Sequence, residues 1–279
     1  MKQRVITAAC ILAVAIPVFI FSWTPAYCAV LAVLSVLAQF ELLRVLGLCK
    51  KWLIAAPAYL LSLAMPVGAY LYIYVFSRPA TGYLLLMALA EMILLLWLFF
   101  VAVLAEGKIP FADIAQVFAC VTYVAVAFAA LTILRYLPGG EYLFLLVFIA
   151  AWISDVFAYF VGVLFGKHKL SPKISPKKTV EGSLGGIAFA IVAFLLYGFL
   201  FGRFGGRTPH YPLLAISAVI LAVVSQLGDL LTSLIKREHD VKDYGKLFPG
   251  HGGVLDRFDS VLAVATVLMI ICLVAPPLL

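Results

Sequence analysis

Long runs of apolar residues, separated by short polar segments, dominate this chain of 279 residues. A helix needs about 20 mostly apolar residues to cross a membrane. Spans of that kind are predicted near Val5–Trp23, Ala26–Leu48, Trp52–Phe76, Leu84–Ala105, Phe111–Leu134, Tyr142–Phe165, Ser183–Phe201, Leu213–Ile235 and Val254–Leu279. The pattern therefore predicts an all-α polytopic membrane protein with about nine transmembrane helices.

The composition excludes a soluble fold. Apolar residues make up 66% of the chain and charged residues 12%, against roughly 45–50% and about 25% in soluble domains. The five cysteines form no CxxC pair, so neither a disulfide framework nor a zinc site is expected.

The basic residues predict how the chain is oriented. With the N-terminus in the cytoplasm, 16 of the 20 Lys and Arg residues fall in cytoplasmic segments, as the positive-inside tendency requires. On a membrane protein, the net charge of +7 is better explained by this asymmetry than by nucleic-acid binding. The two most charged loops then both face the cytoplasm, and so would an active site built from them.

Acidic residues within predicted spans need a partner or a purpose, because a charge at mid-membrane costs roughly 2.5–3.5 kcal/mol on insertion scales. Glu41 and Asp113 lie close to span ends, and we interpret them as reaching the interface. Glu91 lies deeper, within MALAEMILLLW. Arg44 or a polar cavity is the candidate partner for Glu91.

Asp155 and Asp229 have polar residues beside them along their helices. Ser154 precedes Asp155, and Asp229 shares a helix face with Ser233 and Lys236, four and seven residues further on. We favour a metal or substrate path for these two acids, and a structural ion pair inside the bundle is the alternative.

A basic loop, GKHKLSPKISPKKTVEGSLGG, connects the sixth and seventh predicted spans. Five lysines precede its first acid: Lys167, Lys169, Lys173, Lys177 and Lys178. The Ser-Pro-Lys triplets at Ser171 and Ser175 predict turns, and Glu181 opens the next helix, whose N-terminus can bind an anion. A patch that attracts anionic lipid explains the lysines equally well.

The stretch KREHDVKDYGKLFPGHGGVLDRFDS gathers charge and glycine between the last two spans. Residues 249–253, PGHGG, predict a tight turn whose backbone N–H groups can approach a ligand. Asp256 and Asp259 follow on the first turns of the last helix, and Asp229 comes from the span before. Such oxygen ligands suit Mg²⁺ together with phosphates, so this stretch predicts phosphoryl or nucleotidyl transfer.

The same stretch resembles the signature of the phosphatidate cytidylyltransferase (CDP-diacylglycerol synthase) family. The matching residues are Ser233, Lys236, Arg237, Lys242, Asp243, Gly245, Pro249, Gly250, His251, Gly252, Gly253, Asp256, Arg257 and Asp259, preceded by Gln226, Gly228 and Asp229. The segment SPKKTVEG, Ser175–Gly182, resembles that family too. The resemblance is strong over about residues 155–260.

The resemblance implies an enzyme that joins CTP and phosphatidic acid into CDP-diacylglycerol and pyrophosphate and requires Mg²⁺. It implies a multi-pass protein of the bacterial inner membrane, with N-terminal helices over residues 1–140 and a catalytic region over 141–279 that carries cytoplasmic loops 166–182 and 236–253. It also suggests a homodimer and a monovalent cation beside Mg²⁺, neither of which the residues themselves indicate.

Roles carry over to single residues as further implications. The principal metal ligands would be Asp229 and Asp256, with Asp259 and Asp155 in support. The nucleotide would contact Ser175, Lys177, Lys178, Thr179, Gly250, Gly252 and Gly253. The remaining catalytic residues would be Lys236, Arg237, Lys242, Asp243, His251 and Arg257, the four cations neutralising phosphate charge. For His251, proton transfer and shaping of the turn are both open.

Three other functions remain as alternatives. A CTP-dependent polyprenol or phytol kinase would release CDP and a phosphorylated lipid alcohol. A secondary transporter also carries acids at depth, but it would not consume CTP and leaves the glycine-rich basic face unexplained. A purely structural scaffold is the weakest alternative, given the cost of so many acids near lipid.

Overall fold

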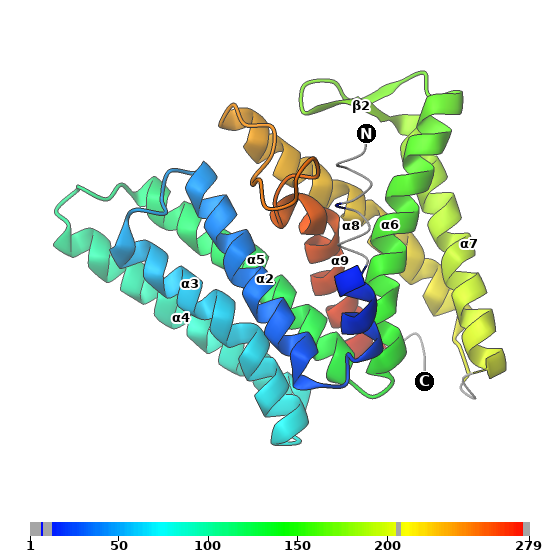
Figure 1. The fold of residues 1–279 in the computed structure, drawn as a ribbon, viewed down its shortest axis with the longest axis horizontal. Coiled ribbons are helices and arrows are strands. Elements are labelled where there is room, and N and C mark those ends of the chain that lie inside the picture. The colour runs from blue at the N-terminus through cyan, green and yellow to red at the C-terminus, as the bar shows by residue number, and fades with distance from the viewer. Residues whose placement is uncertain (1–6, 8–12, 205–207, 276–279) are drawn as a thin grey trace. The chain divides into compact units, whose positions relative to one another are not determined.

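The computed structural model describes residues 7, 13–204 and 208–275 (Figure 1). Its elements are α2 (Pro25–Val45), α3 (Trp52–Ala69), η1 (Tyr70–Val75), α4 (Ala80–Leu104), α5 (Phe111–Tyr136), α6 (Gly140–Phe165), β1 (Lys169–Ser171), β2 (Ser175–Thr179), α7 (Val180–Phe204), α8 (Tyr211–Glu238) and α9 (Leu255–Val274). Within these described ranges, eight helices are long and apolar enough to cross a membrane. The predicted all-α polytopic membrane fold is confirmed.

The predicted spans match these helices closely. Seven of them begin and end within a few residues of the prediction, and the eighth, α9, begins one residue after its predicted start. The first predicted span, Val5–Trp23, lies partly outside the described residues, of which 13–20 are helical. The protein is therefore a multi-pass integral membrane protein.

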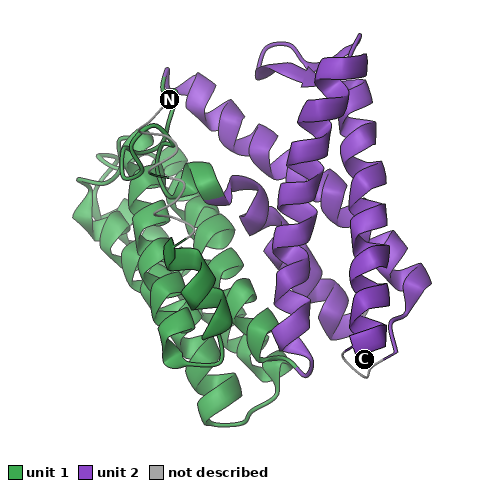
Figure 2. Cartoon of the chain, turned by 45° about the vertical axis from the view of Figure 1, so that its right-hand side comes forward, with its two compact units in different colours: residues 1–137, 241–257 green, residues 138–240, 258–279 purple. Residues whose placement is uncertain are grey.

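The chain divides into two compact units (Figure 2). Unit 1 holds residues 1–137 together with the later segment 241–257, and unit 2 holds residues 138–240 and 258–279. The chain passes from one unit to the other within the first turn of α9. The glycine-rich segment predicted to be catalytic thus belongs with the N-terminal helices.

In unit 1, two prolines lie inside α3, and the helix continues as the π-helical turn η1. A proline frees backbone carbonyls in its own helix, and within a bilayer neighbouring groups must satisfy them. Pro57 leaves the Leu53 carbonyl without its helical donor, and the ring N–H of Trp97 on α4 donates to that carbonyl at 2.9 Å. Beside η1, the Tyr83 hydroxyl donates to the Met65 carbonyl at 2.6 Å. Neighbouring helices therefore compensate for the irregular backbone.

In unit 2, glycines let α6 and α7 pack closely. A Cβ at Gly186 would lie 2.7 Å from the Ser154 carbonyl oxygen, and one at Gly182 would lie 2.5 Å from the Ala158 carbonyl oxygen. The rings of Phe157 and Phe189 stack between the two helices with centroids 3.8 Å apart. This packing holds Asp155, which follows Ser154 on α6, close to the N-terminal half of α7.

The basic loop forms an antiparallel β-hairpin, where the sequence predicted only turns. β1 and β2 pair with Lys169 opposite Thr179 and Ser171 opposite Ser175. Glu181, in the first turn of α7, accepts hydrogen bonds from the backbone N–H of Lys167 at 3.0 Å and of His168 at 3.2 Å. The hairpin is thus anchored to the helix that follows it.

Candidate active site

The hairpin and the C-terminal end of α8 lie together at one end of unit 2. The Lys178 ammonium forms an ion pair with the Asp229 carboxylate at 2.6 Å. Arg237 donates from Nε to the Ile174 carbonyl at 3.4 Å. Lys178, predicted to contact phosphate, therefore lies beside Asp229, predicted from its span to bind metal.

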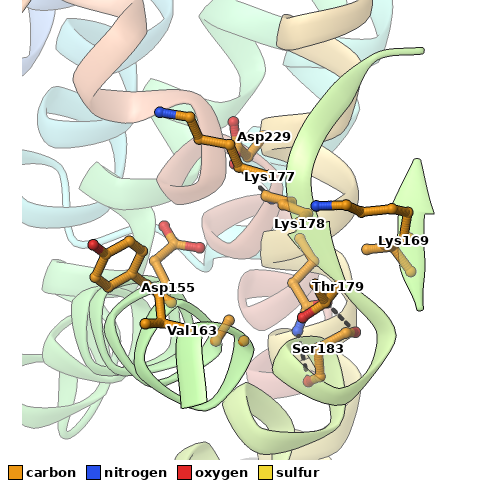
Figure 3. Close-up of a pocket in the computed structure, with 13 residues that line it drawn as sticks. Asp155, Val163, Lys169, Lys177, Lys178, Thr179, Ser183 and Asp229 are labelled. Carbon is orange, nitrogen blue, oxygen red and sulfur yellow. Dashed lines mark hydrogen bonds and ion pairs between the residues drawn. The ribbon is translucent and has the colours of Figure 1, made fainter. Parts of the chain in front are cut away.

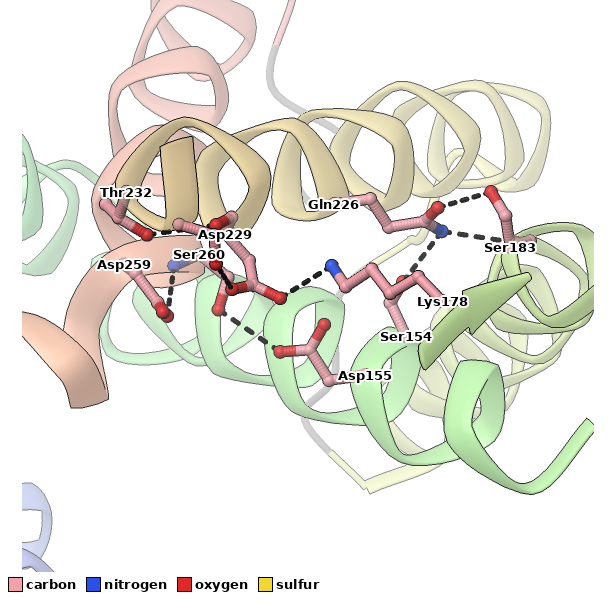
Figure 4. Close-up of polar contacts among 10 residues, drawn as sticks. Ser154, Asp155, Lys178, Ser183, Gln226, Asp229, Thr232, Asp259 and Ser260 are labelled. Carbon is pink, nitrogen blue, oxygen red and sulfur yellow. Dashed lines mark hydrogen bonds and ion pairs between the residues drawn. The ribbon is translucent and has the colours of Figure 1, made fainter. Parts of the chain in front are cut away.

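Carboxylates from three helices gather at this end of unit 2 (Figure 4). They are Asp155 of α6, Asp229 of α8 and Asp259 of α9, and all three interact electrostatically with one another. Ser260 connects two of them, because its backbone N–H donates to Asp259 at 2.8 Å and its hydroxyl to Asp155 at 3.3 Å. The predicted contact of Asp229 with Ser233 is also present, at 3.4 Å.

A buried amide joins α8 to α6, two of the helices that carry these acids, and to α7. Gln226, one turn before Asp229 on α8, donates from Nε2 to the Ser183 carbonyl at 3.2 Å and to the Ser154 hydroxyl at 3.4 Å. The Ser183 hydroxyl donates back to the Gln226 side-chain oxygen. Gln226 therefore joins α6, α7 and α8 one helical turn from Asp229, a role that its place in the motif did not reveal.

A pocket of about 550 Å³ opens beside the cluster (Figure 3). Its polar lining comes from Asp155 and Asp229, from three hairpin lysines (Lys169, Lys177 and Lys178) and from Gln226. Its apolar lining includes Tyr159 and Val163 on α6, both of which are exposed. The pocket thus joins cationic and anionic groups to a surface suited to acyl chains.

All the side-chain atoms that this cluster could offer to a metal ion are oxygens. Within residues 13–204 and 208–275, no three acidic, cysteine or histidine side chains already stand in the arrangement of a metal site, and Lys178 occupies one side of Asp229. One or two carboxylates are nevertheless the protein ligands that Mg²⁺ usually takes together with phosphates and waters. The chemistry of the donor set fits Mg²⁺.

In unit 1, the segment 241–257 forms a compact loop around Asp256. The Asp256 carboxylate is buried and accepts hydrogen bonds from the backbone N–H of Tyr244 at 2.7 Å and of Gly253 at 2.9 Å. Gly250 and Gly252 have φ values of 78° and 87°, the left-handed region that favours glycine. The predicted tight turn is present.

The other predicted residues of this segment differ in exposure. Lys242, Asp243 and Arg257 are exposed, and Nδ1 of His251 is buried with no hydrogen-bond partner in the described part of the chain. Asp229 and Asp256 belong to different units, so their convergence on one ion stays a prediction, as do the roles assigned to the individual site residues.

Three acids outside the motif have partners that the sequence did not assign. Glu41 is enclosed by protein: it is buried and accepts two backbone hydrogen bonds. Asp113, in the first turn of α5, pairs with Lys51, and its place at the interface stays a prediction. Glu91 accepts a hydrogen bond from the Thr122 hydroxyl at 3.1 Å, in place of the considered contact with Arg44. No local sequence pattern indicates the burial of Glu41, because the glycines that face it lie about 200 residues further along the chain.

Comparison with known proteins agrees with the motif. The profile of the cytidylyltransferase family matches residues 2–275. A protein of Staphylococcus haemolyticus named phosphatidate cytidylyltransferase is 32% identical over 272 residues, covering 97% of this chain and 98% of the relative. A Bacillus subtilis protein of the same name is 35% identical over 278 residues, covering 95% and 94%. One from Staphylococcus saprophyticus is 41% identical over 169 residues, covering 61% and 63%.

Proposed function

Because the chain belongs to the cytidylyltransferase family, we propose that it is a phosphatidate cytidylyltransferase, which converts CTP and phosphatidic acid into CDP-diacylglycerol and pyrophosphate. The observation that carries the proposal is the pocket of unit 2, where hairpin lysines and helix carboxylates meet beside an apolar surface. Bacterial relatives named phosphatidate cytidylyltransferase align with this chain over most of their length, which supports the proposal. The reaction belongs to phospholipid biosynthesis in the bacterial inner membrane.

The pocket's two kinds of lining suit two unlike substrates. A triphosphate needs cations, and Lys169, Lys177 and Lys178 supply three from one hairpin. A diacyl lipid needs a path from the bilayer, and the exposed side chains of Tyr159 and Val163 lie at the same opening. Alignment of the two reactants in one site supplies a large share of the rate enhancement of such a transfer.

The transfer itself requires one bond to form and one to break. A phosphate oxygen of phosphatidate attacks the α-phosphorus of CTP, and the bond from that phosphorus to the bridging oxygen of the β-phosphate breaks. No general base is needed, because the second pKa of a phosphate monoester is about 6. Pyrophosphate leaves with both electrons of the broken bond, and the ammonium groups of Lys177 and Lys178 neutralise its charge.

Magnesium dependence is part of the proposal. Asp155, Asp229 and Asp259 would hold the ion, with Asp256 as the ligand that the motif adds. When bound, Mg²⁺ neutralises charge on the phosphates and orients them. The family resemblance also implies a monovalent cation and a homodimer, and both remain predictions. The cytoplasmic orientation of the site is a prediction too.

One assay tests the proposal. The purified protein is incubated with labelled CTP, phosphatidic acid and Mg²⁺ in mixed micelles, and the lipid and nucleotide products are identified. We expect CDP-diacylglycerol and pyrophosphate in equal amounts, and loss of both after addition of EDTA, restored by excess Mg²⁺. Asp229→Asn should abolish turnover without loss of folded protein.

The alternatives give different products. CDP with a phosphorylated polyprenol or phytol would identify a lipid kinase. Transport of a solute with no consumption of CTP would identify a transporter. Full turnover in the presence of EDTA would contradict the magnesium dependence while leaving the transferase activity in place.

A further inference from the structure

Glu41, near the C-terminal end of α2, supplies an N-terminal cap to a helix more than 200 residues away. Its carboxylate accepts hydrogen bonds from the backbone N–H of Val254 at 3.0 Å and of Leu255 at 2.9 Å, one through each oxygen. These N–H groups open α9, where a helix has no partners of its own and attracts negative charge. Glu41 is 6% exposed, so water does not compete for this contact.

Two further side chains secure the same loop. Arg44, one turn after Glu41 on α2, donates to the Tyr244 carbonyl. Asp256 accepts from the N–H of Tyr244 and of Gly253. Polar backbone groups of the segment 241–257 are therefore bound by charged side chains, two of which come from α2.

Two glycines of the signature are required by Glu41. A Cβ at Gly245 would lie 2.7 Å from the Glu41 carboxyl carbon and 2.8 Å from the Gly253 Cα, and a Cβ at Gly253 would overlap the Glu41 carboxylate. Both glycines are buried. Their lack of a side chain makes room for an acid from another helix.

We propose that Glu41 is a positioning residue for the signature segment: through the backbone of Val254 and Leu255 it holds Asp256 and Arg257 in the arrangement that the reaction needs. This inference rests on the proposed function and on the family resemblance, which together assign those two residues to catalysis. Glu41 itself would touch neither substrate.

The negative charge and the length of the side chain both matter in this proposal. A glutamine would place its NH₂ group against one of two N–H donors, so one hydrogen bond would become a repulsion. An aspartate would keep the charge but could not span the same distance, and it should retain part of the effect. Misplacement of reacting groups by about 1 Å can cost 10²-fold in rate.

The test compares Glu41→Gln, Glu41→Asp and Gly245→Ala with the unchanged protein. Steady-state CDP-diacylglycerol synthesis gives kcat and the KM for CTP, and hydrogen exchange followed by mass spectrometry gives the protection of peptides across residues 241–257. Asp113→Asn is the matched control, because it removes an acid of unit 1 whose ion-pair partner, Lys51, does not belong to this loop.

We expect Glu41→Gln to lower kcat by about 10²-fold with little change in KM for CTP, and to speed exchange at residues 253–255. Gly245→Ala should also lower kcat and speed exchange, because its methyl group would displace the Glu41 carboxylate from the loop. The kcat of Glu41→Asp should lie between those of Glu41→Gln and the unchanged protein. Asp113→Asn should leave kcat and loop exchange unchanged.

Wild-type kcat in Glu41→Gln would overturn the inference. So would faster exchange spread evenly over unit 1, because Glu41 would then serve only overall stability. If the unchanged protein makes no CDP-diacylglycerol, the proposed function fails instead, and the exchange measurement still reports whether Glu41 holds the loop.

Discussion

Lys178 has two potential anionic partners within the pocket of unit 2, a carboxylate of the protein and the phosphates of a bound nucleotide. Its ammonium pairs with Asp229 at 2.6 Å, and both side chains are about a quarter exposed, at 24% and 27%. A triphosphate that enters the pocket offers the same ammonium a second anionic partner. Charge-assisted hydrogen bonds of this kind are about twice as strong as neutral ones, so Lys178 should contribute directly to nucleotide binding.

We therefore expect Lys178→Ala to raise the KM for CTP by about 10- to 100-fold, the range for hydrogen bonds to charged groups. Initial rates over a series of CTP concentrations measure this. Lys173→Ala is the control, since Lys173 lies in the turn of the same hairpin, is exposed, and is not among the pocket residues. Equal KM values for the two variants would remove Lys178 from the nucleotide site.

At the scale of elements, the α6–α7 pair positions much of the site. It carries Asp155 on one helix and supports the hairpin through Glu181 on the other. The close approach depends on glycines that face backbone atoms, and backbone cannot move aside as a flexible side chain does. The geometry of the pocket should therefore be sensitive to the volume of residues far from any substrate.

Gly186→Ala tests this dependence. The added methyl would meet the Ser154 carbonyl, and overpacking of this kind costs about 1–3 kcal/mol. We expect a lower Tm in detergent and reduced activity, measured by thermal unfolding and by product formation. Ala188→Leu, which adds bulk on the exposed face of the same helix, should change neither. An unchanged Tm in Gly186→Ala would mean that the helices can separate freely.

At the scale of the whole molecule, the charge distribution sets the expected orientation. The hairpin and the end of α8 share one end of unit 2, as the contact of Arg237 with the Ile174 carbonyl demonstrates. The positive-inside tendency assigns such lysine-rich segments to the cytoplasm. CTP is then available on the side where the pocket opens, and the lipid arrives from within the bilayer.

Cysteine labelling checks the orientation. After replacement of the native cysteines, Lys173→Cys in the hairpin and Arg78→Cys before α4 provide two exposed positions. We expect a membrane-impermeant maleimide to label position 173 in inverted vesicles and position 78 in intact cells. The opposite result would reverse the topology and move the pocket away from cytosolic CTP.

The sequence by itself determined the membrane class, nearly every span and the residue types of the site. These are local properties: twenty apolar residues form a spanning helix whatever surrounds them, and a turn rich in glycine needs only its own residues. The family resemblance likewise depended on spacing within one segment, Ser233–Asp259. The hairpin was missed because its strands are short and mostly polar, so neither shows the alternating apolar pattern of a half-buried strand.

Only the tertiary structure decided which distant residues meet. The pairing of Lys178 with Asp229 and the capping of α9 by Glu41 join positions far apart in the chain. No periodicity in the sequence encodes such contacts. Helices of similar hydrophobicity pack together according to the shapes of their surfaces and the need to satisfy buried polar groups. For the same reason Gly245 and Gly253 could be recognised as a motif from the sequence, but the acid that requires them became visible only after folding.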